Sequence, residues 1–153
     1  MNLIGYVTLE EANEYIKTHY LSTDSLRVLW EGLTDNDRTV LLNKSFQGIE
    51  LLPFTGRKAQ LSQSKAFPRW PYEEVPSAVK FAQIEEAVAM SDASAEEDFR
   101  HYSTLRSNGV SSYTIGNLSE SLSASTGTGH ATVFRSALAE RLLRPFLGGG
   151  YRM

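Results

Sequence analysis

Apolar residues recur at helical spacing along the first third of the chain. Thr8 and Glu11 stand at the two ends of a capping-box pattern, and the apolar positions that follow predict a first helix over about residues 8–20. A short helix over 26–31 and a longer one over 35–52 follow, ended by a glycine and a proline respectively. Acidic residues open the longer helix, where they favour its positive end.

A proline opens the next helical stretch. Pro76 suits the first turn of a helix, because its fixed φ is already helical and its missing N–H is not needed there. The residues that follow Pro76 form an apolar face, made by Val79, Ile84 and Val88. A second capping box that starts at Ser94 predicts a further helix, or a bent continuation of the same one, reaching about Ser107.

The period then changes from helical to alternating. Two alternating segments on either side of Gly116-Asn117 predict a β-hairpin over about residues 110–122. Its faces are rich in serine and thinly apolar, and an isolated two-stranded hairpin is marginal in water. We therefore expect the hairpin to lie outside the core of the subunit and to need a partner.

The last segments complete the predicted architecture. Residues 123–129 have the composition of a flexible linker, 131–143 the pattern of a final helix, and 148–153 the composition of a flexible tail. The sequence therefore predicts a mainly α protein, a bundle of four or five helices with one β-hairpin and an extended C-terminal tail. We expect residues 1–147 to form a single domain into which the hairpin is inserted.

Residues 54–72 form a basic segment with aromatic residues at its end. Two prolines and three aromatics lie within six residues, and each proline keeps its predecessor out of the α region, so this piece is predicted to be extended. Aromatic side chains among cations can stack bases and neutralise phosphates. Alternatively, Phe67 and Trp70 pack onto the helical bundle while the cations are solvated. The candidate residues for an intersubunit contact or a loop anchor are Phe67, Arg69, Trp70 and Tyr72.

Charge is unevenly distributed, although the net charge is only −3. Residues 1–50 contain 4 basic and 8 acidic side chains, and residues 81–120 contain 2 and 7. Residues 51–80 contain 5 basic and 2 acidic side chains, and residues 121–153 contain 4 and 1. There is no global positive field for nucleic acid, whereas alternating blocks suit head-to-tail contact between copies of one protein. The same blocks are equally compatible with solvated faces.

The sequence lacks the motifs of catalysis and metal binding. The three histidines are not at metal-ligand spacing, and adjacent glutamates on a helix point apart. Gly127-Thr128-Gly129 resembles part of a phosphate loop but lacks the Lys-Ser/Thr ending and the preceding strand. There is no cysteine, no G-x-S-x-G motif, no signal-peptide pattern and no apolar run of membrane-spanning length. We therefore expect a non-enzymatic protein that uses no cofactor, metal or membrane.

Four short motifs carry a family resemblance. They are YVTLEEANEY at residues 6–15, AFPR at 66–69, VPSAVKFA at 75–82 and LLRPFL at 142–147. In this order they resemble the head–tail connector family of tailed bacteriophages, whose members are also called adaptor or head-completion proteins. A related grouping is that of phage proteins described as primosomal ssDNA-binding-like. The resemblance extends from Tyr6 to Leu147.

The resemblance implies a helical structural protein of the virion, located at the head–tail junction. Such a protein assembles as a homo-oligomeric ring, expected here to be twelvefold, beneath the portal protein after DNA packaging. The ring extends the channel through which the packaged DNA passes and docks the next neck or tail-completion protein. In this family the C-terminal segment reaches the portal, so the candidate portal contacts are Arg144, Phe146, Leu147, Tyr151 and Arg152.

Two other functions stay open at this point. One is a single-stranded-DNA-binding replication accessory protein, which strongly salt-dependent binding would reveal. The other is a small phosphate-loop enzyme.

For the connector, we expect deletion of residues 145–153 to leave the fold and the melting temperature nearly unchanged. We also expect Trp70→Ala to cost about 3–5 kcal/mol if Trp70 is buried in the core, and little if it belongs to an intersubunit contact.

Overall fold

The computed structural model describes residues 2–107, 112–115, 118–121 and 134–148, and it confirms a mainly α protein with the predicted hairpin. Within these ranges the secondary-structure elements are β1 (Leu3–Ile4), β2 (Val7–Thr8), α1 (Leu9–His19), α2 (Ser25–Glu31), α3 (Asp35–Glu50), α4 (Ser77–Ala89), α5 (Ala93–Ser107), β3 (Ser112–Ile115), β4 (Leu118–Ser121), α6 (Ala137–Leu143) and the 3-10 helix η1 (Arg144–Phe146).

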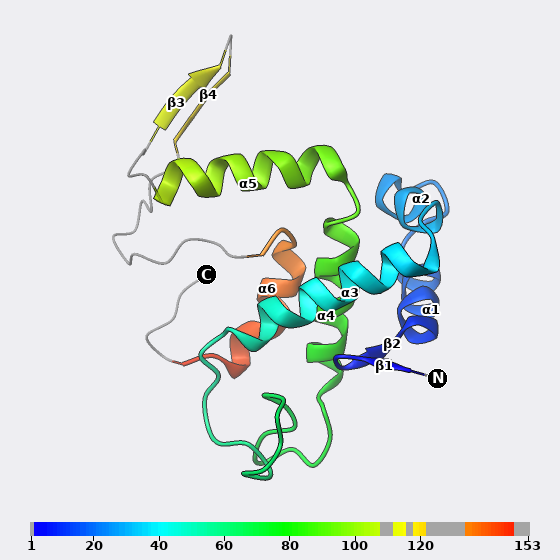
Figure 1. The fold of residues 1–153 in the computed structure, drawn as a ribbon, viewed down its shortest axis with the longest axis vertical. Helices are drawn as coiled ribbons and strands as arrows, with labels where there is room; N and C mark the ends of the chain where they lie inside the picture. The colour runs from blue at the N-terminus through cyan, green and yellow to red at the C-terminus, as the bar shows by residue number, and fades with distance from the viewer. Residues whose placement is uncertain (1, 108–111, 116–117, 122–133, 149–153) are drawn as a thin grey trace.

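The helices are divided between a body and a projecting arm. Figure 1 shows α1 to α4 and α6 gathered into the body, with α5 lying across one end of it and the β3–β4 hairpin standing beyond α5. We call α5 and this hairpin the arm. The hairpin is antiparallel, and its register pairs Ile115 with Leu118 and Ser112 with Ser121. None of the helices in the described ranges is both long and apolar enough to cross a membrane.

A short β-ribbon precedes the first helix, and the sequence analysis missed it. Strands β1 and β2 pair antiparallel around Gly5, whose φ is +72°. A Cβ at this position would also lie 2.5 Å from a ring carbon of Phe46 in α3. Glycine is required here because it tolerates both the left-handed backbone and the close approach of the ring. Each strand has only two residues, which is too short to show the alternating pattern from which a strand is predicted.

The first three helices begin at side-chain caps. The Thr8 Oγ1 accepts a hydrogen bond from the Glu11 N–H at 3.1 Å, as the capping-box pattern predicts for α1. The Asp24 carboxylate caps α2, and the Thr34 hydroxyl caps α3. Each cap provides an acceptor for a backbone donor that has no partner within its own helix, which is why these boundaries can be predicted locally.

Helix α4 is the central helix and is buried on nearly every side. It packs against α3 and α6 and also contacts β2, α1 and α2. Because so little of the helix faces water, its buried polar side chains must find partners inside the protein. Gln83, which is fully buried, hydrogen-bonds to the backbone of Ile4, Tyr6 and Leu42. The helix therefore joins the N-terminal ribbon and α3 through one amide side chain.

Three helix starts differ from the sequence predictions. Pro76 is the N-cap of α4 rather than a residue of its first turn. The cap of α5 is Asp92, whose Oδ1 accepts from the backbone N–H groups of Ser94 and Ala95 at 3.1 and 3.2 Å, so the capping box predicted at Ser94 is wrong. Helix α6 begins only after its cap Ser136, because the residues before it bind a buried carboxylate of α4. Residues 131–133 of the predicted final helix lie outside the described ranges.

Candidate interaction surfaces

Phe67 anchors residues 54–72, which we call the basic loop, to the body. Its side chain is only 2% exposed. The ring packs edge-on against Tyr6, Phe54 and Phe146, with centroid distances of 6.0, 4.7 and 5.5 Å. Edge-to-face aromatic packing at these distances is favourable. Phe67 is therefore the point at which the loop enters the core.

Arg69 holds the basic loop in its folded shape. Its guanidinium donates hydrogen bonds to the backbone carbonyls of Thr55, Gly56 and Ala66 at 2.9, 2.8 and 3.2 Å. These carbonyls satisfy the donors of Arg69 but do not neutralise its charge. The basic loop has four cations, Arg57, Lys58, Lys65 and Arg69, and none of them forms an ion pair with a described carboxylate. The salt bridges of the described residues involve other cations, namely Arg27, Arg38, Lys80, Arg100 and Arg135. The loop consequently keeps its positive charge.

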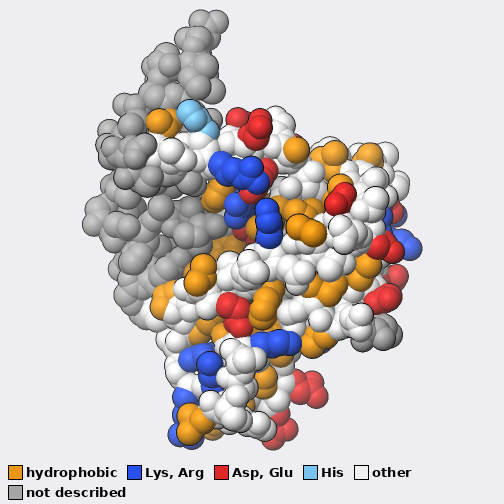
Figure 2. Space-filling view, viewed as in Figure 1, with side chains coloured by type: hydrophobic (Ala, Val, Ile, Leu, Met, Phe, Trp, Pro, Cys, Tyr) orange, Lys and Arg blue, Asp and Glu red, His pale blue; other side chains and the backbone are white. Residues whose placement is uncertain are grey.

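Trp70 and Tyr72 lie on the surface at the end of the loop. Their exposed fractions are 64% and 48%, so of the two residues that the packing interpretation placed on the bundle, only Phe67 is buried. Arg57 is also exposed. Figure 2 shows basic side chains gathered at the end of the molecule where Figure 1 places this loop. Exposed aromatics and uncompensated cations make this loop a candidate binding surface.

The C-terminal segment is packed into the body as far as Gly148, which argues against the expectation that deletion of residues 145–153 leaves the fold and the melting temperature nearly unchanged. Leu147 is 8% exposed and forms a β-bridge with Phe54. The carbonyl of Phe146 accepts a hydrogen bond from the Thr55 N–H at 2.8 Å, and the Gly148 N–H donates to the Pro53 carbonyl at 3.0 Å. Of the candidate portal contacts, Phe146 is half-buried, Leu147 is buried and Arg144 is exposed, whereas Tyr151 and Arg152 lie outside the described residues.

Arg135 connects the arm to the body. Its guanidinium pairs with the Glu96 carboxylate of α5 at 2.8 Å and lies 4.2 Å from the ring centroid of Phe99. On the other side it lies 3.6 Å from Glu86 of α4, and its backbone N–H donates to the same carboxylate at 2.7 Å. Sequence reasoning missed this site, because the partners of Arg135 are 39 and 49 residues away along the chain.

An open groove lies between α5 and the body. It has a volume of about 560 Å³ and is lined by Leu41 and Lys44 of α3 and by α5 residues that include Glu97 and Arg100. Protein interiors are close-packed, and voids larger than a water molecule are few. Helix α5 is therefore not packed into the core along this side, and its connection through Arg135 carries correspondingly more weight.

Burial raises the pKa of Glu86 to about 7, an effect that its hydrogen bonds to Ser136 and Arg135 and the charge of Arg135 only partly offset. The folded protein therefore binds this proton more tightly than the unfolded chain does. The resulting stability is fully present below about pH 4.5 and is lost as pH rises through about 7.

We expect the free energy of unfolding to fall by up to about 3 kcal/mol between pH 4.5 and pH 8 because of Glu86. Glu86→Gln cannot ionise and should lose this slope, whereas Glu97→Gln, a change at an exposed position of α5, should keep it. Urea unfolding at several pH values measures both variants against the wild type. An unchanged slope in Glu86→Gln would contradict the assignment.

The fold and these surfaces define a small, mainly helical protein with a basic loop and a projecting arm. Within the described ranges, no group of three or more His, Cys, Asp or Glu side chains is placed to hold a metal ion. Residues 4–153 match the family described as "Putative DnaT-like ssDNA binding protein", and the chain belongs to this family. No curated protein and no solved structure is significantly similar to it.

Proposed function

We propose that this protein is a non-enzymatic structural adaptor of a phage virion neck, a head–tail connector that assembles as a ring beneath the portal protein. The observation that carries the proposal is the arm. Figure 1 shows it projecting from the body, and within the described ranges Arg135 provides every ion pair between α5 and the body. The head–tail connector motifs of the sequence support the same function.

An arm of this kind is expected to find its partners in other subunits. A two-stranded hairpin is marginal in water by itself, and the extensive packing of β3 among the described elements is with β4. In a ring each arm meets a neighbouring copy, and every contact is repeated around the axis. Such repetition can raise the overall affinity by about 10²–10⁴ without any new contact. Weak subunit contacts are then sufficient for a stable neck.

The proposed partners are the portal protein on one side of the ring and the next neck or tail-completion protein on the other. Arg144, at the start of η1, is the exposed one of the three portal-contact candidates that the structure describes. Tyr151 and Arg152 stay candidates for the same contact. The packaged DNA passes through the channel of the ring, so the channel itself requires no sequence-specific contact with bases.

We expect the purified protein to co-sediment with DNA-filled, portal-bearing heads that lack it and to add a ring of density below the portal in electron micrographs. A variant in which a short Gly-Ser linker replaces residues 112–121 should keep its helical circular dichroism but lose retention on the heads. The matched control replaces exposed Leu138 by Ala. Wild-type protein that stays in the supernatant would contradict the proposed function. Full retention of the hairpin-deleted variant would show that the hairpin is not needed for the ring.

Binding of single-stranded DNA is a second candidate function, and the basic loop favours it. Trp70 and Tyr72 are exposed beside cations that form no ion pairs with described residues, and base stacking on aromatics with neutralisation of phosphates is the usual basis of such binding. The family description names the same activity.

An oligonucleotide titration followed by Trp fluorescence at several salt concentrations tests this function. Affinity that falls steeply with salt, and falls again in Trp70→Ala, would support it. Trp30 is buried, which makes Trp70 the accessible reporter of the two tryptophans.

A further inference from the structure

The basic loop carries exposed aliphatic side chains in addition to its aromatics. Leu61 is 93% exposed, and Leu51, at the end of α3 just before the loop, is 86% exposed. Aliphatic side chains have no aromatic face on which a base can stack, so they add nothing to a nucleic-acid site of the usual kind. Almost fully exposed leucines of this kind are available for burial in a protein–protein contact, where apolar area is removed from water.

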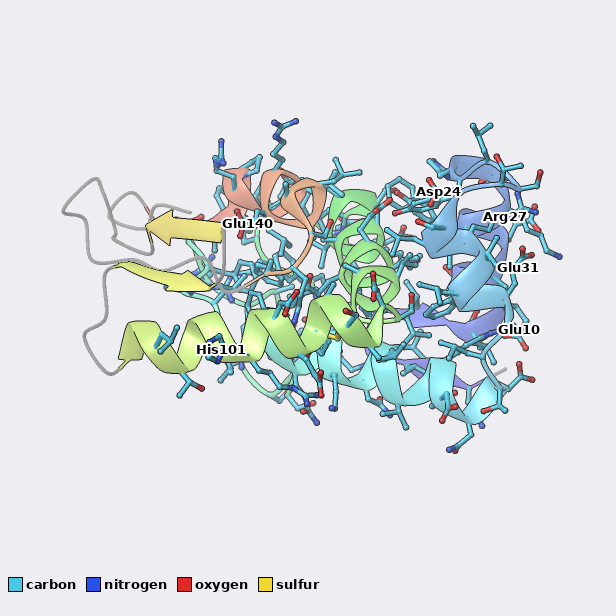
Figure 3. The ribbon with its side chains drawn as sticks, turned by 90° about the horizontal axis from the view of Figure 1, so that it is seen from above. Glu10, Asp24, Arg27, Glu31, His101 and Glu140 are labelled. Carbon is cyan, nitrogen blue, oxygen red and sulfur yellow. The ribbon has the colours of Figure 1, made fainter. Side chains whose placement is uncertain are left out.

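A second surface of the body has the complementary character. Glu10 and Glu14 lie four residues apart on the face of α1 opposite its buried residues, and α2 exposes Val28 and Leu29 at 55% and 40%. Figure 3 shows Glu10, Asp24, Arg27 and Glu31 along one outer edge of the molecule. We call this outward face of α1 and α2 the acidic edge.

The two surfaces carry opposite net charges. Residues 9–31, which span α1 and α2, contain five acidic and two basic side chains, a net charge of −3. Residues 54–72 contain four basic and no acidic side chains, a net charge of +4. Glu73 and Glu74 follow the loop and line a groove together with its Lys65, and with them residues 54–74 still have a net charge of +2. Complementary charge of this kind steers association and selects the orientation of the partners.

The two surfaces cannot cover each other within one copy. They are joined by α3, whose 16 residues span about 24 Å. Figure 1 shows α1 and α2 on one side of the body and the loop at the lower end of the molecule. Contact between like surfaces would bring like charges together, which is unfavourable, whereas contact between unlike surfaces leaves one of each free for the next copy. That is a heterologous interface, which generates rings when the rotation closes.

We propose that the basic loop of one copy docks on the acidic edge of a second copy, with Leu61 and Trp70 packing against Val28 and Leu29. The inference rests on the ring assembly proposed above and identifies two faces that form a subunit contact in it, in addition to the contact of the arm. Arg57, which is exposed on the loop, then lies opposite the carboxylates of α1. The interface combines apolar burial with charge pairing, so its affinity falls with salt but is not abolished by it.

The test uses one variant for each face and then their mixture. Arg57→Glu with Leu61→Glu disables the loop, and Glu14→Lys with Val28→Lys disables the edge; all four side chains are exposed. In sedimentation velocity, each variant should need at least a tenfold higher concentration than wild type for half-association. The equimolar mixture should recover association and form 1:1 dimers at concentrations where either variant alone is monomeric, because one intact edge meets one intact loop. Leu138→Lys, on α6 and outside both faces, should associate like wild type.

Disulfide cross-linking tests the contact between the basic loop and the acidic edge in the assembled ring. The chain has no cysteine, so Leu61→Cys together with Val28→Cys introduces the only thiols. Mild oxidation should link successive copies, in solution or on portal-bearing heads, and Leu61→Cys with Leu138→Cys should not. A ring that forms on heads without this cross-link would contradict the docking of the basic loop on the acidic edge but not the connector function. Failure of the protein to bind heads would contradict the connector function itself. Loop variants that lose oligonucleotide binding yet associate like wild type would assign the loop to DNA and overturn the docking.

Discussion

Replacing Phe67 by Ala should lower the free energy of unfolding by about 3–5 kcal/mol, the usual range for truncating a buried phenylalanine. The reason is the position of the ring, which is 2% exposed and lies against three other aromatic rings. The variant loses the buried area of the ring and leaves a cavity that Tyr6, Phe54 and Phe146 can fill only in part. For a chain of this length, the melting temperature should fall by roughly 10 °C.

Trp70→Ala is the matched control, three residues away in the same loop. Its side chain is 64% exposed, so the change in the free energy of unfolding should stay within about 0.5 kcal/mol. Urea unfolding followed by circular dichroism measures both variants. Equal losses in the two variants would contradict the assignment of Phe67 as the anchor and Trp70 as a surface residue. A stable Trp70→Ala protein that no longer assembles would instead support the intersubunit contact.

Deleting residues 145–153 should destabilise the body strongly. The deletion removes buried Leu147, for which truncation to alanine alone costs about 2–5 kcal/mol, and half-buried Phe146 beside Phe67. It also removes the backbone hydrogen bonds that join this segment to Pro53 and Thr55, worth about 1 kcal/mol each. Natural domains are stable by only about 5–15 kcal/mol, so the truncated chain is expected to be largely unfolded or close to it.

Deleting only residues 149–153 is the control. The difference in stability between the two truncated proteins is the contribution of residues 145–148. Thermal unfolding of both proteins, together with Leu147→Ala, measures that difference. Two truncations with the same melting temperature would show that the packing of Leu147 contributes little to the fold. If the shorter truncation folds normally but is not retained on heads, the last five residues would be assigned to the portal contact.

Local signals in the sequence determined the helices and the starts of the first three. Thr8, Asp24 and Thr34 cap helices because each side chain reaches a backbone N–H two or three residues away. The hairpin was predictable for the same reason, since its alternating pattern and Gly-Asn turn are local. Helix content and the order of the helices follow from interactions over a few residues. The aromatic segment, predicted to be extended, instead turns at Trp70-Pro71, where the Tyr72 N–H donates to the Arg69 carbonyl at 2.7 Å. The family motifs are also short stretches of this kind.

Only the tertiary structure decided which side chains of these elements are buried. Phe67 and Trp70 are both aromatic residues followed by proline, and nothing local distinguishes them; Phe67 is buried because Tyr6 and Phe146 come from the two ends of the chain to meet it. The same holds for Leu147, which lies in a segment that resembles a tail but bonds to residues more than 90 positions earlier.

Glu86 and Arg135 show the physical reason most clearly. A glutamate inside a helix and an arginine near a glycine-rich stretch both resemble solvated surface residues in the sequence. Glu86 is buried and its pKa raised because α3, α6 and the chain before α6 enclose α4, and its oxygens then accept backbone N–H groups 49 and 50 residues away. Burial and pairing of this kind depend on how distant elements pack, so they became visible only in the folded protein.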